Sequence, residues 1–323
     1  MIQSLKNLSA IFIAILILFA SDMAYTQNTT TDEKNKTAAE VKKDDKTAGT
    51  GTDKVKPEDK KNAEVKDEKK TVKDSKKKEP LDETKKAEHI ETTLKFGIQK
   101  DRKIAINQIR HIQDKAIQKK LTALLVDIIV NDSDMEIRKT AITVIGDLKA
   151  EGASGALIKA LDDEAEDVRI AACFAIGRLK TAEAKPALIE LIKKQDLTKD
   201  SNLTDAIITA LGDLGAPEIV PFAVEAIKDS KNSKMAREKL LLFIGKNGSG
   251  EQKDFLLEIY KDEEQEMLMR SYAVKSIAKL KITAAAPDIK AVISEINSYQ
   301  FAKKKKYYDL YIHSVAALAE MGD

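Results

Sequence analysis

The chain has 323 residues, of which 33% are charged and 43% hydrophobic, and its formal net charge is +2. So small a net charge lacks the basic excess that marks nucleic-acid-binding proteins. Its single cysteine, Cys173, excludes an intrachain disulfide and a multi-cysteine metal site. Trp is absent, and with only 6 Pro and 13 Gly the composition favours helices over sheets.

Residues 1–26 have the pattern of an export signal peptide. Lys6 provides a positive start, and residues 8–20 form an apolar run interrupted only by Ser9. This run is shorter than the roughly 20 residues that a membrane span needs. We expect cleavage between Ala20 and Thr26, which predicts an exported protein of the periplasm or cell envelope. The alternative is a leader that is retained and anchors the protein in the membrane.

Residues 27–86 form a low-complexity segment rich in Lys, Asp, Glu and Thr. It holds 18 Lys against 15 Asp plus Glu and no aromatic residue. Mixed charge with almost no apolar side chain cannot offset the entropy lost on ordering the chain. The segment is therefore predicted to be a disordered linker. Its role is either that of a solvated spacer or a weak contact with anionic envelope polymer or a membrane surface.

Residues 87–323 contain a segment that recurs along the chain. In one copy Arg138, taken as position 0, is followed by Ala141 at +3, Ile145 at +7 and Gly146 at +8. Further copies start at Arg102, Arg169, Arg237 and Arg270, with variant copies at Thr204 and Tyr311. The copies begin 31 to 41 residues apart. A period in this range is typical of helical arrays.

Positions −1, +3, +4, +7 and +10 of each copy fall on one stripe of a helix. Small residues at +3 and +8 allow a neighbouring helix to approach closely. Second helices with their own apolar stripe lie between the copies, and a first helix is expected near 87–96. The fold class is thus all-α, an α-solenoid of about seven antiparallel helix pairs stabilised by stacking.

Two segments, 132–146 and 163–172, resemble HEAT repeats, in particular the short bacterial class called PBS-lyase HEAT-like repeats. The resemblance implies a superhelix whose arginine-bearing helices line the concave side. It also implies an inter-repeat ladder between each arginine and a turn acid six residues before it. The pairs that fit are Asp132 with Arg138, Asp163 with Arg169, and Glu264 with Arg270. Positions 198 and 231 hold Thr and Lys, so the ladder should break near repeats four and five.

No cluster of residues suggests catalysis. The three histidines, His89, His111 and His313, are scattered and none is followed by Glu, as an iron-hydroxylase member of the repeat family would require. Cys173 lies on the core stripe and is interpreted as a buried hydrophobe, the alternative being a reactive thiol. Residues 246–250 lack the pattern of a phosphate-binding loop and predict a helix-ending turn with a left-handed Gly. We therefore expect no catalytic, cofactor-binding or metal-binding residue, and no enzyme.

The remaining candidate site is the concave face, where positions +1 and +5 point away from the core. The candidate groove consists of Lys139, Thr143, Ile170, Phe174, Thr209, Leu242 and Lys275. Exposed apolar residues grouped in a groove mark a protein-binding surface. The alternative is that these apolar residues pack between neighbouring repeats. A separate basic and aromatic cluster at 303–308 suggests contact with anionic polymer, lipid or a partner, or else a solvated helix start.

The function predicted from these features is a non-enzymatic scaffold or adaptor of the bacterial cell envelope. It would bind an unidentified protein partner through the concave face, without cofactor, metal or nucleic acid. One alternative is a structural envelope protein whose Lys-rich linker contacts anionic wall polymer or membrane. A second is a lyase-like or metal-dependent HEAT-repeat enzyme.

Overall fold

The computed structural model describes residues 82–323, which belong to one compact unit, Pro80–Asp323. The predicted leader and the predicted linker up to residue 81 lie outside the described residues. Throughout 82–323 the regular structure is helical and no strand occurs, which confirms the all-α class. None of the helices in this range is long and apolar enough to cross a membrane.

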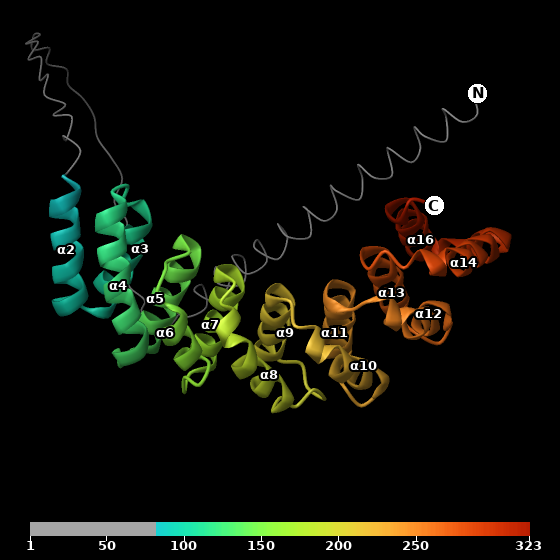
Figure 1. Cartoon of the computed structure of the whole chain (residues 1–323), viewed down its shortest axis with the longest axis horizontal. Helices are drawn as coiled ribbons and strands as arrows, with labels where there is room; N and C mark the ends of the chain where they lie inside the picture. Colours follow the sequence, from blue (N-terminus) through green and yellow to red (C-terminus); the bar gives the residue numbers. More distant parts are fainter. Residues whose placement is uncertain (1–81) are drawn as a thin grey trace, which may run out of the picture. The chain divides into compact units, whose positions relative to one another are not determined.

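Seven helix pairs follow one another along the described residues, as predicted (Figure 1). The first members of the pairs form the outer row: α2 (Glu83–Phe96), α4 (Lys115–Asn131), α6 (Ser154–Ala160), α8 (Lys185–Lys193), α10 (Val220–Lys228), α12 (Lys253–Lys261) and α14 (Ala286–Ser298). The second members carry position 0 and form the inner row: α3 (Gln99–Gln108), α5 (Met135–Leu148), α7 (Glu166–Leu179), α9 (Asn202–Leu214), α11 (Lys234–Asn247), α13 (Met267–Lys279) and α16 (Tyr308–Met321). Figure 1 shows α9, α11 and α13 on the concave side of this array, with α8, α10 and α12 on the convex side.

Shorter helices complete the array. A six-residue helix, α15 (Phe301–Lys306), stands between α14 and α16. Single 3-10 turns occur at Ile109–His111, Ala182–Ala184, Pro217–Ile219, Gly250–Gln252 and Thr283–Ala285. Four of these turns lead directly into an outer-row helix, so each of those α-helices is preceded by one turn of 3-10 helix.

The first helix begins earlier than the sequence pattern predicted. Helix α2 starts at Glu83, four residues before the expected boundary at 87. Residues 83–86, which were predicted to be the end of the linker, therefore belong to the helix. The Asp82 carboxylate accepts a hydrogen bond from the backbone N–H of Thr84 at 3.1 Å and caps the helix. Apolar periodicity does not detect the first turn of α2, because the residues of that turn are polar. The first buried residue of the helix is Ala87.

Small residues bring successive inner-row helices into close contact. Ala141 on α5 and Ala172 on α7 are fully buried. A Cβ added at Gly146 would lie 3.2 Å from the Cα of Ala175 on the next helix. At Gly245 the added Cβ would lie 2.9 Å from the Cα of Ser276. The inner row therefore packs backbone against backbone at these positions, which is the role expected of small residues at +3 and +8.

Most inner-row helices end in a left-handed residue at position +11. Those residues are Lys149, Lys180, Gly215, Lys281 and Gly322, with φ between 50° and 83°. Gly248 occupies the same position but has φ −78°, so the prediction of a left-handed glycine there is wrong. A glycine is nevertheless needed, because a Cβ at this residue would lie 2.7 Å from the carbonyl oxygen of Ile244.

Candidate partner-binding surface

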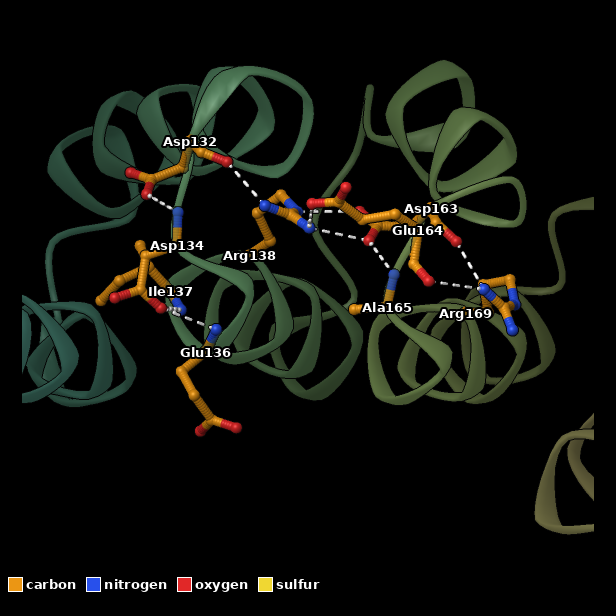
Figure 2. Close-up of polar contacts among 9 residues, drawn as sticks. All are labelled: Asp132, Asp134, Glu136, Ile137, Arg138, Asp163, Glu164, Ala165 and Arg169. Carbon is orange, nitrogen blue, oxygen red and sulfur yellow. Dashed lines mark hydrogen bonds and ion pairs between the residues drawn. The ribbon is translucent and has the colours of Figure 1, made fainter.

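Arg138 joins two consecutive repeats at the start of α5 (Figure 2). Its Nε and Nη2 atoms each donate a hydrogen bond of 2.8 Å to the carboxylate of Asp163. The Nη1 atom donates to the backbone oxygen of Asp132 at 2.9 Å. Arg138 and Asp163 expose only 7% and 10% of their side chains, so this two-pronged pair is almost fully removed from water.

The pair affects the titration of both partners. Hydrogen bonding to Asp163 raises the pKa of Arg138 despite its burial. Burial raises the pKa of Asp163, but the hydrogen bonds from Arg138 and from the backbone N–H of Ala165 outweigh it and leave that pKa lowered. The charged form of each residue is therefore favoured by its partner.

The ladder crosses between repeats differently from the predicted pairing. Arg138 bonds the carboxylate of the following repeat, whereas Asp132 offers it only a backbone oxygen. Asp132 instead forms an ion pair with Arg102 of the preceding repeat. Arg169 donates to the backbone oxygens of Asp163 and Glu164, at 2.6 and 3.1 Å. Arg138 and Arg169 thus each hold their own turn through a backbone oxygen, and Arg138 also holds the next turn through a carboxylate.

The turn acid itself recurs in five turns. Asp132, Asp163, Asp196, Asp229 and Asp262 each accept, through Oδ1, the backbone N–H two residues further on. This bond is the Asx turn that short acidic side chains favour. The acid stands six residues before position 0 in the first two turns and eight residues before it in the last three. These aspartates recur every 31 to 33 residues, and this spacing could have identified them from the sequence. The last three were missed in the sequence analysis, because the acid was assumed to stand always six residues before position 0.

The longer turns coincide with missing rungs. Glu264, predicted to pair with Arg270, is exposed, and the turn acid of that repeat is Asp262. Arg270 donates from Nε to the backbone oxygen of Tyr260 at 2.8 Å and stacks 5.5 Å from the ring centroid of Tyr307. Within 82–323 no ion pair joins Arg237 or Arg270 to an acid, and Nε of Arg237 is buried without a hydrogen bond.

A second ladder, which the sequence analysis missed, runs across the ends of the inner-row helices. Arg110 bonds Asp147 at 2.6 Å, and Asp147 also pairs with Arg178 of the next helix. Further along, Asp213 pairs with Lys246 at 2.5 Å. Four of these residues share position +9 with alternating charge, which is the pattern that a repeat alignment could have revealed. All are partly exposed, so each pair contributes little to stability.

The polar residues predicted for the groove lie on three inner-row helices: two of them on α5, one on α9 and one on α13. Lys139 is half-buried and bonds Asp167 at 2.6 Å. Thr143 and Thr209 are exposed, and the hydroxyl of Thr143 donates to the backbone oxygen of Lys139. Lys275 is half-buried beside the ring of Tyr272, 6.0 Å from its centroid. The ion pair of Lys139 keeps that side chain on the protein surface rather than free for a ligand.

The three apolar residues predicted for the groove differ in exposure. Ile170 is half-buried and packs against the core, as the alternative interpretation expected. Leu242 is half-buried. Phe174, on α7, is the most exposed of the three, with 42% of its surface accessible. At position +5 it is flanked by Thr143 on α5 and Thr209 on α9, both of which are exposed.

The groups considered for chemistry do not converge. Cys173 is buried, and burial raises the pKa of its thiol to about 12. His89 is exposed on α2, His111 is exposed at the end of the 3-10 turn after α3, and His313 is half-buried on α16. Among residues 82–323 no three His, Cys, Asp or Glu side chains are grouped as metal ligands. A pocket of about 250 Å³ between α2 and α4 contains the Arg102 and Asp132 pair and so belongs to the ladder.

Comparisons with known proteins concern the fold. A search of curated proteins finds no match. Among solved structures, the chain is similar to a chain in the structure of the complex of CpcE and CpcF of phycocyanin lyase from Nostoc sp. PCC7120. The identity is 16% and the TM-score 0.44, over 79% of this chain and 99% of that chain. A family model described as HEAT repeats matches residues 122–201, which span α5 and α7 and both partners of the Arg138 rung. The resemblance to HEAT repeats that the sequence predicted is thereby confirmed, and the chain contains HEAT repeats.

Proposed function

We propose that this chain is a scaffold or adaptor that binds a protein partner on the inner row of its solenoid. The observation that carries the proposal is the exposure of Phe174, a large apolar side chain on a face whose neighbours at the same repeat position are polar. Binding energy at protein interfaces is concentrated in a few aromatic anchors surrounded by a polar rim. Phe174 with Thr143 and Thr209 beside it has this composition.

The location that we propose is the bacterial cell envelope. Support comes from the sequence, where a positive start precedes an apolar run of the length found in export signals. Fractionation of cells that produce the full chain tests this part by itself. Recovery of the protein in the cytoplasm, with residues 1–26 still attached, would contradict it.

We propose further that the chain acts by binding and not by catalysis. The one thiol is buried and held protonated, and the histidines stand on pairs at opposite ends of the array. Metal analysis and an absorbance spectrum of the purified full chain are the tests. A stoichiometric metal or a bound chromophore would favour the lyase-like or metal-dependent alternative.

The partner site is tested by affinity capture from envelope extracts with the full chain as bait. Phe174→Glu should lose partners that the wild type retains, because it places a charge where an apolar anchor is needed. Phe96→Glu is the matched control, since Phe96 is 82% exposed but lies at the end of α2 in the outer row. Equal recovery with wild type and Phe174→Glu would remove the proposed site. Adding Leu242→Glu, with thermal unfolding as a folding check, extends the test to α11.

A further inference from the structure

Helix α15 is the segment by which the last repeat departs from the others. Position 0 recurs every 31 to 36 residues up to Arg270, but Tyr311 follows after 41. The added length is the helix Phe301–Lys306, inserted between the outer helix α14 and the inner helix α16. Insertions in helical repeats map to loops on one face, which is often the binding face.

One side of α15 is fixed to the rest of the last repeat. The ammonium of Lys303 lies 3.8 Å from the ring centroid of Tyr299 and 5.6 Å from that of Tyr307. These two rings contact each other edge to face, with their centroids 5.2 Å apart. Lys304 donates to the side-chain oxygen of Asn297 at 2.8 Å. The short helix is therefore held in a defined orientation.

The other side of α15 faces solvent and combines aromatic rings with positive charge. Phe301 is 86% exposed and Tyr308 is 60% exposed. Lys305 stands four residues after Phe301, a spacing that places these two on one face of α15, and Tyr308 follows as the first residue of α16. Lys305 and Lys306 are exposed, and in the described part of the chain no ion pair or hydrogen bond engages their side chains.

We infer that α15, together with Tyr308, docks on a bilayer surface that carries anionic phospholipid headgroups. Aromatic rings favour the boundary between headgroups and acyl chains, and lysines near an anionic leaflet are attracted to it. A phosphate polymer free in solution would satisfy the lysines but would leave Phe301 in water. The inference is independent of the protein-partner site, because Phe174 lies on α7 of the third pair whereas these residues lie in the last pair.

The test places a fluorescent reporter on α15 in the full chain. Ala302→Cys introduces an exposed thiol beside Phe301, and an environment-sensitive dye is attached to it. Cys173 does not compete, because it is buried and its thiol stays protonated. The probes are vesicles of phosphatidylglycerol with phosphatidylcholine, vesicles of phosphatidylcholine alone, and soluble polyphosphate. The apolar run at residues 8–20 is present in every variant, so a difference between variants with the same vesicles does not come from it.

The expected result is a blue shift of the dye with phosphatidylglycerol vesicles, and none with phosphatidylcholine or polyphosphate. Lys305→Glu with Lys306→Glu should raise the lipid concentration for half-maximal shift by at least about tenfold, since each lysine contributes roughly a factor of five. Lys193→Glu with Lys194→Glu changes the charge equally at the exposed end of α8 and should leave binding unchanged. Phe301→Ser should reduce the blue shift.

Three results would overturn the inference. They are equal shifts with both kinds of vesicle, a shift produced by polyphosphate alone, and unchanged binding after reversal of Lys305 and Lys306. All substituted residues are exposed, so circular dichroism is expected to show the wild-type helix content in each variant. Failure here would leave the capture experiment on Phe174 unaffected, because that experiment tests a residue of a different repeat.

Discussion

Arg138 and Asp163 meet across two repeats through two hydrogen bonds of 2.8 Å, one from Nε and one from Nη2. The two residues are 25 positions apart in the sequence, and both side chains are at least nine-tenths buried. A carboxylate and a guanidinium in this parallel arrangement form the strongest kind of side-chain hydrogen bonding. The pair therefore links the stacking of α5 on α7 to the geometry of the turn between α6 and α7.

Removing the guanidinium should be costly. We expect Arg138→Ala to lower the free energy of unfolding by about 3 kcal/mol, because Asp163 would remain buried without its cation. Urea unfolding followed by circular dichroism measures the loss. Lys139→Ala is the control, since its ion pair with Asp167 is partly exposed to water and should contribute less than about 1 kcal/mol. Similar losses in the two variants would show that burial of the Arg138 pair is unimportant.

The same pair predicts a pH dependence. The pKa of Asp163 is lowered in the folded protein, so its contribution is fully present above the unfolded value of about 3.9. That contribution is lost as the pH falls through the lowered folded value. The stability advantage of the wild type over Asp163→Asn should therefore shrink as the pH is lowered from 6 to 3. Urea unfolding of both proteins at each pH checks this, and a constant difference would contradict it.

Gly245 should not tolerate a methyl group. A Cβ there would lie 2.9 Å from the Cα of Ser276, so α11 and α13 would have to separate. We expect Gly245→Ala to destabilise the protein by roughly 1–3 kcal/mol in thermal or urea unfolding. Gly155→Ala in α6 has no heavy atom within 4 Å of the new Cβ. It should instead stabilise by about 0.5 kcal/mol, because alanine reduces the conformational freedom of the unfolded chain. Loss of stability in both variants would argue against close packing as the cause.

Lys149 is a site where glycine should improve stability. Its φ of 50° lies in the left-handed region, which costs an L-residue about 1–2 kcal/mol. Lys149→Gly relieves this strain but adds freedom to the unfolded chain, so we expect a net gain of about 0.5 kcal/mol. Lys149→Ala retains the strain and should show no gain in thermal unfolding. A gain with alanine and not with glycine would exclude the backbone explanation.

Cys173 should be inert in the folded protein. Burial raises the pKa of its thiol to about 12, so the reactive thiolate is scarce at pH 8. We expect negligible reaction with a thiol reagent in native conditions and complete reaction in concentrated urea. Ser133→Cys, at an exposed turn, should add one rapidly reacting thiol. Rapid native labelling of Cys173 itself would indicate that α7 opens easily.

The amino-acid sequence by itself determined the class of fold and the series of helix pairs. The recurrence of Arg, Ala and Ile at positions 0, +3 and +7 is a local property, because a helix converts this spacing into one apolar face without help from distant residues. The same local pattern identified the HEAT repeats and placed Phe174 away from the core. It missed the first turn of α2, where the signal is the cap Asp82 and not an apolar residue.

The tertiary structure alone decided which charged residues meet. An offset of six assigned Glu264 to Arg270, but the longer turns put Asp262 in the turn position and leave Glu264 in solvent. Likewise, Lys303 lies over the ring of Tyr299 and pairs with Glu263, whereas Lys305 extends into solvent, although the four consecutive lysines are alike in the sequence. The physical reason is that ion pairs and exposure depend on distances between repeats. Those distances are set by turn length and by how closely the helices stack, and neither is encoded in the periodicity of a single helix.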